Sequence, residues 1–451
     1  MNISTFSDDL FELIEFAERL EKFIETEQEY VDGSLVIALS SKYGSGKTTF
    51  LKMWKNRITS ADENNKRPLV ISLNAWESDY YGDPLFSIVS AIIDSLSENG
   101  VPSQSLLDAA KDVGWFTTAI GSQVANRITG IDAVAAGDFT EKKKKERQET
   151  SRDLPDSFST YLDRKKAMKS LKKELEHVVR NSSLRVLFLV DELDRCRPDY
   201  AISYLGTIKH IFDIKGAIFV LAADRHHLEN SAKTAFGLNL DFEEYYRKFI
   251  HREVTLPQIS KTGYERLASK YLTYYLEKEG LRNCFMALDR HRLNNISELI
   301  GALKLTPRQT QEVFRILGHT LSTSKEKKGR MRWTLAVGSI AMVAFKVGEP
   351  RIFSLLGSQQ FDCKEAADYL VQLMDKTDIE WWFLLFVTGG GLHMQEGEKY
   401  QDLIERAGFT DEQGNISIRD ELATWEREWG YSKSAHFSEI RRKIEQISQW
   451  D

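Results

Sequence analysis

A turn with two glycines joins an apolar segment to a helical one near the start of the chain, and it ends in a lysine and a threonine. It spans residues 41–48 (SKYGSGKT), between an apolar run at 35–39 and residues 49–54. Backbone N–H groups of such a turn point at phosphate oxygens. We expect Lys47 to reach the β- and γ-phosphates of a nucleotide and the Thr48 hydroxyl to hold Mg²⁺. The residues predicted to bind the nucleotide are Tyr43, Gly44, Ser45, Gly46, Lys47, Thr48 and Thr49.

Two adjacent acids follow a second apolar run. Asp191 and Glu192 come directly after residues 184–190, which read as a buried strand. The carboxyl end of such a strand lies beside the phosphate-binding turn in open α/β sheets. We therefore expect Asp191 to hold the Mg²⁺ shell, through water, and Glu192 to orient or activate the attacking water. Without the turn at 41–48, the two acids would mean only that a strand ends at the surface.

Other polar residues are candidates for sensing the γ-phosphate. Asp224 follows a strand at 217–222, where it either senses the phosphate through water or caps a helix at 225–235. Arg308 is the best placed of four arginines, because Thr306 and Pro307 precede it at an expected helix start. The four candidates for an arginine finger or sensor are Arg195, Arg225, Arg247 and Arg308, and the residues predicted to be catalytic are Lys47, Glu192 and Arg308.

The elements that must position these residues alternate between strands and helices. Strands are expected at 34–40, 68–73, 184–190 and 217–222, and helices at 46–58, 84–96 and 198–212. This alternation of Val-, Ile- and Leu-rich strands with helices predicts an α/β fold with a parallel sheet covered on both faces. Ser7, Asp8 and Asp9 are expected to cap a first helix that runs to Glu27.

The second half of the chain has a different pattern. Helical periodicity dominates from about residue 259 onward, so we place a boundary near Leu256 and Pro257. The predicted domains are 1–257, with an insert at about 99–181, and a helical region at 258–451. Within the insert, residues 99–153 read as irregular and 155–181 as a lysine-rich helix. The aromatic run at 381–386 is interpreted as core.

Composition limits the classes of function. The 451 residues carry a formal net charge of −6, which does not support nucleic-acid binding, although basic segments at 142–145 and 325–332 leave it open. Three cysteines without a C-x-x-C pair argue against a zinc site and a disulfide framework, and they fit a reducing cytoplasm. The most apolar stretch, 115–137, is too polar to span a membrane. We therefore expect a cytoplasmic protein with no membrane span.

Several motifs taken together resemble those of the KAP family of P-loop NTPases, which is related to the AAA+ and STAND groupings of the additional-strand class. The motifs are 43–48 (YGSGKT), 74–77 (NAWE), 190–196 (VDELDRC), 221–225 (LAADR), 245–250 (YYRKFI) and 306–309 (TPRQ), and the resemblance covers about residues 8–320. It implies ATP as the nucleotide, Asp191 as the acid associated with Mg²⁺ and Glu192 as the candidate catalytic acid. Asp194 and Arg195 belong to the same signature, and Trp76 is interpreted as a core anchor rather than a residue that stacks on a ligand.

Two features depart from the family pattern. Ser41 stands where the general phosphate-loop pattern has its first glycine. Many members also carry membrane-spanning helices between the phosphate loop and the acidic strand, whereas this interval is too polar here, so the chain resembles a soluble member. Bacterial members are similar to components of phage-exclusion and antiviral defence systems, often encoded beside an effector.

These observations predict an ATP-hydrolysing switch or assembly ATPase that acts through self-association or a partner effector. One alternative is a nucleotide-gated scaffold that binds ATP and hydrolyses little. Another is a DNA-associated ATPase, which salt-dependent DNA binding would reveal.

Overall fold

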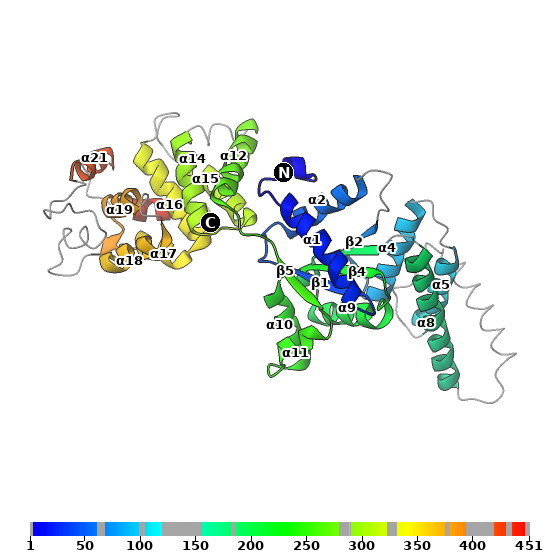
Figure 1. Cartoon of the computed structure of the whole chain (residues 1–451). Coiled ribbons are helices and arrows are strands. Elements are labelled where there is room, and N and C mark those ends of the chain that lie inside the picture. The colour runs from blue at the N-terminus through cyan, green and yellow to red at the C-terminus, as the bar shows by residue number, and fades with distance from the viewer. Residues whose placement is uncertain are drawn as a thin grey trace. The chain divides into compact units, whose positions relative to one another are not determined.

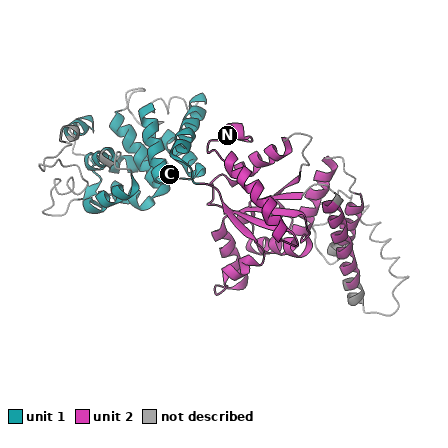
Figure 2. Cartoon of the chain, in the orientation of Figure 1, with its two compact units in different colours: residues 1, 258–451 teal, residues 2–257 magenta. Residues whose placement is uncertain are grey.

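The chain forms two compact units, residues 2–257 and residues 258–451 together with residue 1 (Figure 2). A computed structural model describes residues 3–60, 68–98, 104–119, 156–181, 186–278, 288, 290–322, 332–374, 379–393, 419–429 and 435–446. Each unit is described by itself below.

A five-stranded sheet forms the centre of residues 2–257 (Figure 1). Its order is β2-β3-β4-β1-β5, and every neighbouring pair is parallel. The acidic strand β3 is thus separated from β1 by β4, which is the additional-strand arrangement that the resemblance implies. The strands are β1 (Leu35–Ser40), β2 (Leu69–Asn74), β3 (Val186–Asp191), β4 (Ala217–Ala223) and β5 (Arg252–Thr255).

Helices cover both faces of this sheet, so the predicted α/β fold class is confirmed. Leu35, Ile37 and Leu39 of β1 pack on one face with α1 (Ile14–Glu27) and α2 (Lys47–Ser60). Val36 and Ala38 point to the other face, because successive strand residues alternate. That face is covered by α4 (Pro84–Glu98), α5 (Gln104–Ala119), α8 (Asp156–Asn181), α9 (Pro198–Ile211), α10 (Arg225–Phe236) and α11 (Phe242–Arg247).

Two local predictions in this unit are wrong. Residues 104–119 are not irregular: they form α5, which packs beside α8 (Figure 1). Its buried residues Leu106, Ala109 and Val113 make a sparse stripe at helical spacing.

The first helix also begins later than expected, at Ile14. The Asp9 carboxylate accepts hydrogen bonds from the backbone N–H groups of Phe11 (2.9 Å) and Leu13. These bonds, with Glu12 at a φ of 59°, hold residues 9–13 in a turn. Before it lies a short 3₁₀ helix, η1 (Phe6–Asp8).

Residues 258–451 form a helical unit, as predicted. The buried helix α16 (Trp333–Gly348) lies at its centre. The residues of the aromatic run from Trp382 to Phe386 are all buried, so the interpretation as core is confirmed for these positions. The other described elements are α12 (Lys261–Glu277), α14 (Arg290–Ala302), α15 (Pro307–Ser322), α17 (Pro350–Gly357), α18 (Cys363–Leu373), α19 (Ile379–Thr388), α21 (Arg419–Trp429), α22 (His436–Gln446) and the paired two-residue strands β6 (Phe361–Asp362) and β7 (Leu392–His393).

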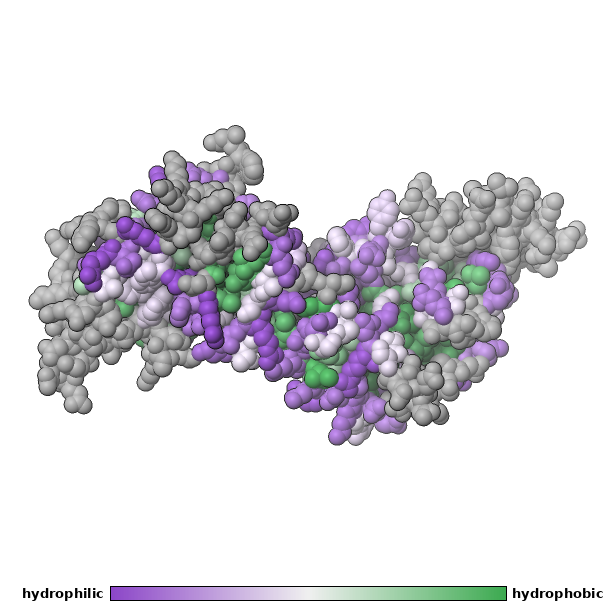
Figure 3. Space-filling model, turned by 90° about the horizontal axis from the view of Figure 1, so that it is seen from above, coloured by the Kyte–Doolittle hydropathy of each residue, from purple (hydrophilic) through white to green (hydrophobic). Residues whose placement is uncertain are grey.

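The surface is largely polar on the face drawn in Figure 3, where described apolar residues form small separate patches between hydrophilic ones. Among the helices in the described ranges, none is long and apolar enough to cross a membrane.

Candidate functional site

The phosphate loop lies between the carboxyl end of β1 and the first turn of α2. Gly44 and Gly46 have positive φ values of 77° and 102°, which favour glycine. Ser45 N–H donates to the Lys42 carbonyl at 3.1 Å, and Phe50 N–H donates to the Gly46 carbonyl at 2.9 Å. The loop is therefore a constrained turn that leads directly into a helix N-terminus, the arrangement that binds phosphate.

The serine in place of the first glycine has a simple structural reading. Among the described residues, positive φ outside glycine occurs only at Glu12, Glu192, Lys304 and Gln359. The backbone at Ser41 therefore has no conformational need for glycine. Its carbonyl instead accepts a hydrogen bond from the Lys47 ammonium at 2.6 Å.

Lys47 is almost fully buried, with 8% of its surface exposed. Its ammonium also lies 3.7 Å from the Asp194 carboxylate, whose side chain is buried too. Nearby, the Ser45 hydroxyl is buried and has no hydrogen-bond partner among the described residues. A buried cation beside an unpartnered polar group fits a loop built to bind an anion.

Asp191, the last residue of β3, reaches the first turn of α2. Burial raises the pKa of its carboxyl group, and a hydrogen bond with the Thr48 side chain opposes that rise. A buried carboxylate next to a hydroxyl is a pair of hard oxygen donors, which suits Mg²⁺ held together with phosphate oxygens and water. Within the described ranges, no group of three or more His, Cys, Asp or Glu side chains is placed to hold a metal ion by itself.

Glu192 is in the left-handed region, with a φ of 61°, and it begins the short 3₁₀ helix η3 (Leu193–Arg195). Its Oε1 atom forms an ion pair with the Arg195 guanidinium at 2.7 Å. The same guanidinium lies over the ring of Tyr43, at 5.3 Å, and over that of Trp76, at 5.4 Å. The predicted catalytic glutamate is thus linked through one arginine to the phosphate loop and to the segment after β2.

Asp194 connects the phosphate loop to the next strand. One of its carboxylate oxygens accepts a hydrogen bond from the backbone N–H of Asp224 at 2.9 Å and is the atom nearest to Lys47. The Asp224 side chain accepts from the backbone N–H of His226 at 3.0 Å. Of the two interpretations left open for Asp224, the hydrogen bonding supports the helix cap.

The prediction that Trp76 is a core anchor is wrong, because 51% of its surface is exposed. Asn74, at the end of β2, accepts hydrogen bonds from the backbone N–H groups of Trp76 and Glu77. This cap begins α3 (Ala75–Asp79) and places Trp76 in the first turn, outside the core.

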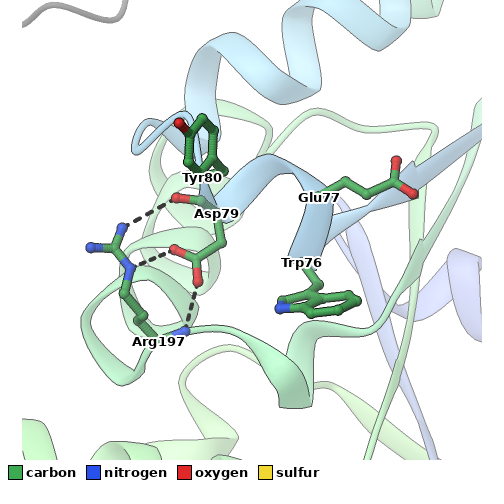
Figure 4. A pocket seen from close by; sticks show the side chains of 5 residues that line it. All are labelled: Trp76, Glu77, Asp79, Tyr80 and Arg197. Carbon is green, nitrogen blue, oxygen red and sulfur yellow. Dashed lines mark hydrogen bonds and ion pairs between the residues drawn. The ribbon is translucent and has the colours of Figure 1, made fainter.

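Beside Trp76 lies a surface pocket of about 580 Å³ (Figure 4). Its other lining residues are Glu77, Asp79, Tyr80 and Arg197. Arg197 donates to Asp79 from its backbone N–H at 2.8 Å and from its guanidinium at 2.9 Å. The sequence offered no signal for this pair, because its members lie far apart in the chain and match no motif.

The four candidate arginines have different surroundings. Arg195 contacts Glu192, as described above. Arg225 is paired with Glu253 at 2.5 Å and with Glu243, which makes it part of a salt-bridge cluster. Arg247 is exposed at the end of α11. Arg308 belongs to the helical unit, and its predicted catalytic role stays a prediction.

The helix start beside Arg308 has the expected form. Gln309 N–H donates to the Thr306 hydroxyl at 3.3 Å, and Thr306 N–H donates to the Gln309 side chain at 3.0 Å. These reciprocal bonds form a capping box, with Pro307 at the first helical position. The predicted cap is confirmed.

Comparison with known proteins places the chain in a family. Two solved structures of the Aeropyrum pernix ORC2 protein are similar, one in ADPNP–ADP complexes (13% identity, TM-score 0.34) and one in the ADP form (12%, 0.32). The matches cover 97% and 96% of this chain and 94% and 93% of theirs. No curated protein matches the sequence. The family model described as the KAP family P-loop domain matches residues 13–324, which is more than half of the chain. With its phosphate loop and acidic strand at one edge of an additional-strand sheet, the chain belongs to the KAP family of P-loop NTPases.

Proposed function

We propose that this protein binds and hydrolyses ATP and uses the cycle as a switch or to drive assembly, acting through self-association or a partner effector. The observation that carries the proposal is the meeting of two segments at one edge of the sheet. Lys47 and Thr48 begin α2, and the Thr48 side chain is hydrogen-bonded to Asp191 at the end of β3. Glu192 follows at once. Membership of the family supports ATP as the nucleotide.

Each of these residues has a distinct part in phosphoryl transfer to water. The loop N–H groups and Lys47 would hold the phosphates, with Lys47 turning from the Ser41 carbonyl toward them. Glu192 would accept the proton of the attacking water. Thr48 and Asp191 would hold Mg²⁺, which when bound offsets the negative charge of the phosphates. Arg308 would add positive charge as an arginine finger or sensor.

The decisive experiment is phosphate release by the purified protein with ATP and Mg²⁺. Lys47→Ala and Glu192→Gln are expected to abolish turnover, and Arg308→Ala to reduce it. Arg19→Ala, on the exposed face of α1, serves as the control for an exposed arginine. Light scattering in each nucleotide state is expected to show an ATP-dependent change in mass. If ATP binds without turnover, and Glu192→Gln equals the parent, the chain is instead a nucleotide-gated scaffold.

The biological setting is the finer part of the proposal. The resemblance to bacterial members of the family supports a cytoplasmic role in antiviral defence, with the effector activity on a partner protein. The alternative, a DNA-associated ATPase, depends on the basic segments 142–145 and 325–332, which lie outside the described residues except for Arg332. Binding to DNA that weakens steeply as salt rises would favour this alternative over the protein partner.

A further inference from the structure

One side chain at the nucleotide site has no part in the chemistry described so far. Arg195 contacts Glu192, which precedes it by three residues in the turn after β3, and two segments that are distant in the sequence, at Tyr43 of the phosphate loop and Trp76 after β2. All three segments leave the carboxyl edge of the sheet. The guanidinium therefore joins this edge across three strand ends.

The contacts are suited to fixing a group in place. The side chains of Arg195 and Glu192 are 32% and 15% exposed, so their ion pair is shielded from solvent more than an ordinary surface pair. A planar guanidinium packs on aromatic faces while its N–H groups bind a carboxylate, a combination that lysine does not reproduce. Tyr43 and Trp76 thus restrict the guanidinium, and the guanidinium restricts the carboxylate.

Glu192 itself needs such restraint. Its left-handed backbone costs about 1–2 kcal/mol for a residue other than glycine. The conformation is held by its N–H, which donates to Asp191 Oδ1 at 2.9 Å, and by its carbonyl, which accepts from Arg195 N–H at 3.1 Å. These bonds fix the main chain only. The ion pair with Arg195 is the interaction that directs the carboxylate.

We propose that Arg195 is a positioning residue, which Tyr43 and Trp76 hold so that it sets the orientation of the Glu192 carboxylate for hydrolysis. The inference rests on the proposed function, because it assigns Glu192 to the hydrolytic step. It couples the phosphate loop to the glutamate through the Tyr43 ring. It also explains why Trp76 is partly exposed at this edge rather than buried in the core.

The test separates catalysis from binding. Arg195→Ala is expected to lower kcat about 10- to 100-fold while KM for ATP stays nearly unchanged, because misplacement of a reacting group by about 1 Å costs up to ~100-fold in rate. Arg195→Lys is expected to lie between the parent and the alanine variant. The double-mutant cycle uses Glu192→Asp, which keeps a carboxylate and measurable turnover. Since Arg195 acts through Glu192, the loss in the double variant Glu192→Asp with Arg195→Ala should be smaller than the product of the two single losses. Arg19→Ala, at an exposed arginine of α1 that is not a candidate for the site, is the matched arginine control.

A second measurement is independent of turnover. The emission of Trp76 is taken as the difference between the parent and Trp76→Phe, and its quenching by acrylamide is measured. Arg195→Ala is expected to increase that quenching, because the guanidinium no longer covers the indole. The Arg195 variants are also compared with the parent by circular dichroism, so that a loss of folding is not read as a loss of positioning.

The outcomes distinguish the two proposals. Turnover by the parent that Arg195→Ala leaves unchanged overturns the positioning role alone, as does a loss confined to KM. If the increases in activation free energy in the two single variants add up in the double variant, Arg195 acts on the nucleotide directly and not through Glu192. A parent that binds ATP without turnover overturns both the hydrolytic function and this inference.

Discussion

Replacing Asp194 tests how the phosphate loop is tied to the neighbouring strand. The Asp194 carboxylate accepts the Asp224 N–H at 2.9 Å and lies 3.7 Å from the Lys47 ammonium. In Asp194→Ala the Asp224 N–H loses its acceptor, which costs about 1–3 kcal/mol. Lys47 loses a partner but keeps the Ser41 carbonyl, and the repulsion between Asp194 and Asp191 is relieved. We therefore expect a net loss of about 2 kcal/mol for alanine, near the middle of that range.

Asp194→Asn separates the two contacts. Both variants lose the charge opposite Lys47, but the asparagine keeps an oxygen for the Asp224 N–H, so it should destabilise the protein less than alanine does. For a unit of this size, 2 kcal/mol corresponds to a fall in Tm of roughly 4–8 °C. The assay is thermal unfolding of the full chain, followed in the transition that Mg·ATP shifts upward. If asparagine destabilises that transition as much as alanine does, or if neither changes it, the assignment of the stability to the Asp224 hydrogen bond is wrong.

Three further predictions concern buried titratable groups. Burial raises the pKa of the Asp191 carboxyl group, so its contribution to stability is present below pH 3.8 and is lost as pH rises through the raised pKa. Asp191→Asn should therefore raise Tm at pH 7, by an amount that vanishes toward pH 3. The same variant should abolish Mg²⁺-dependent turnover. The His251 ring accepts a hydrogen bond from the Val36 N–H at 3.0 Å, and burial lowers the pKa of this histidine below 6.5. The stability that His251 contributes above pH 6.5 should therefore fall as pH drops toward 5. The free energy of unfolding of His251→Gln, measured by denaturation, should fall less over the same range. Burial raises the pKa of the Cys196 thiol to about 12, and Cys363 is buried as well. Mass spectrometry should therefore find both cysteines alkylated by iodoacetamide only after unfolding. Rapid labelling of the native protein would contradict the burial.

The strands that carry the nucleotide site were predictable because each has two local signals, an apolar run and the polar residues that directly follow it. Residues 35–39 and 184–190 are continuous apolar runs, and each is followed at once by the residues that act at the sheet edge. In a parallel sheet buried on both faces, such runs are the expected pattern. The structure places these strands within two residues of their predicted bounds. The phosphate loop and Asp191 could therefore be found from the sequence.

The elements that were missed have weak local patterns. Strand β5 has four residues and three of them are exposed, so it offers no apolar run, and its place in the sheet comes from pairing with β1. Trp76 looks like a core residue by type, yet the cap from Asn74 directs it outward. The pair of Asp79 and Arg197 joins segments that only the folded sheet brings together. Long-range pairing decides the place of β5 and the contact between Asp79 and Arg197, whereas a local helix cap decides the direction of Trp76.

The turn after β3 explains why the acidic signature is longer than nucleotide hydrolysis alone requires. Asp191 faces α2 through Thr48, while Asp194 faces the Lys47 ammonium and the N–H that begins α10. Between them Glu192 turns back toward Arg195, which packs on the phosphate loop. Each charged residue therefore contacts a different neighbouring segment, and the left-handed residue at the start of the turn sets their directions. Contacts of this single turn thus join the glutamate to each of these segments, which is what the proposed nucleotide-driven switch would require.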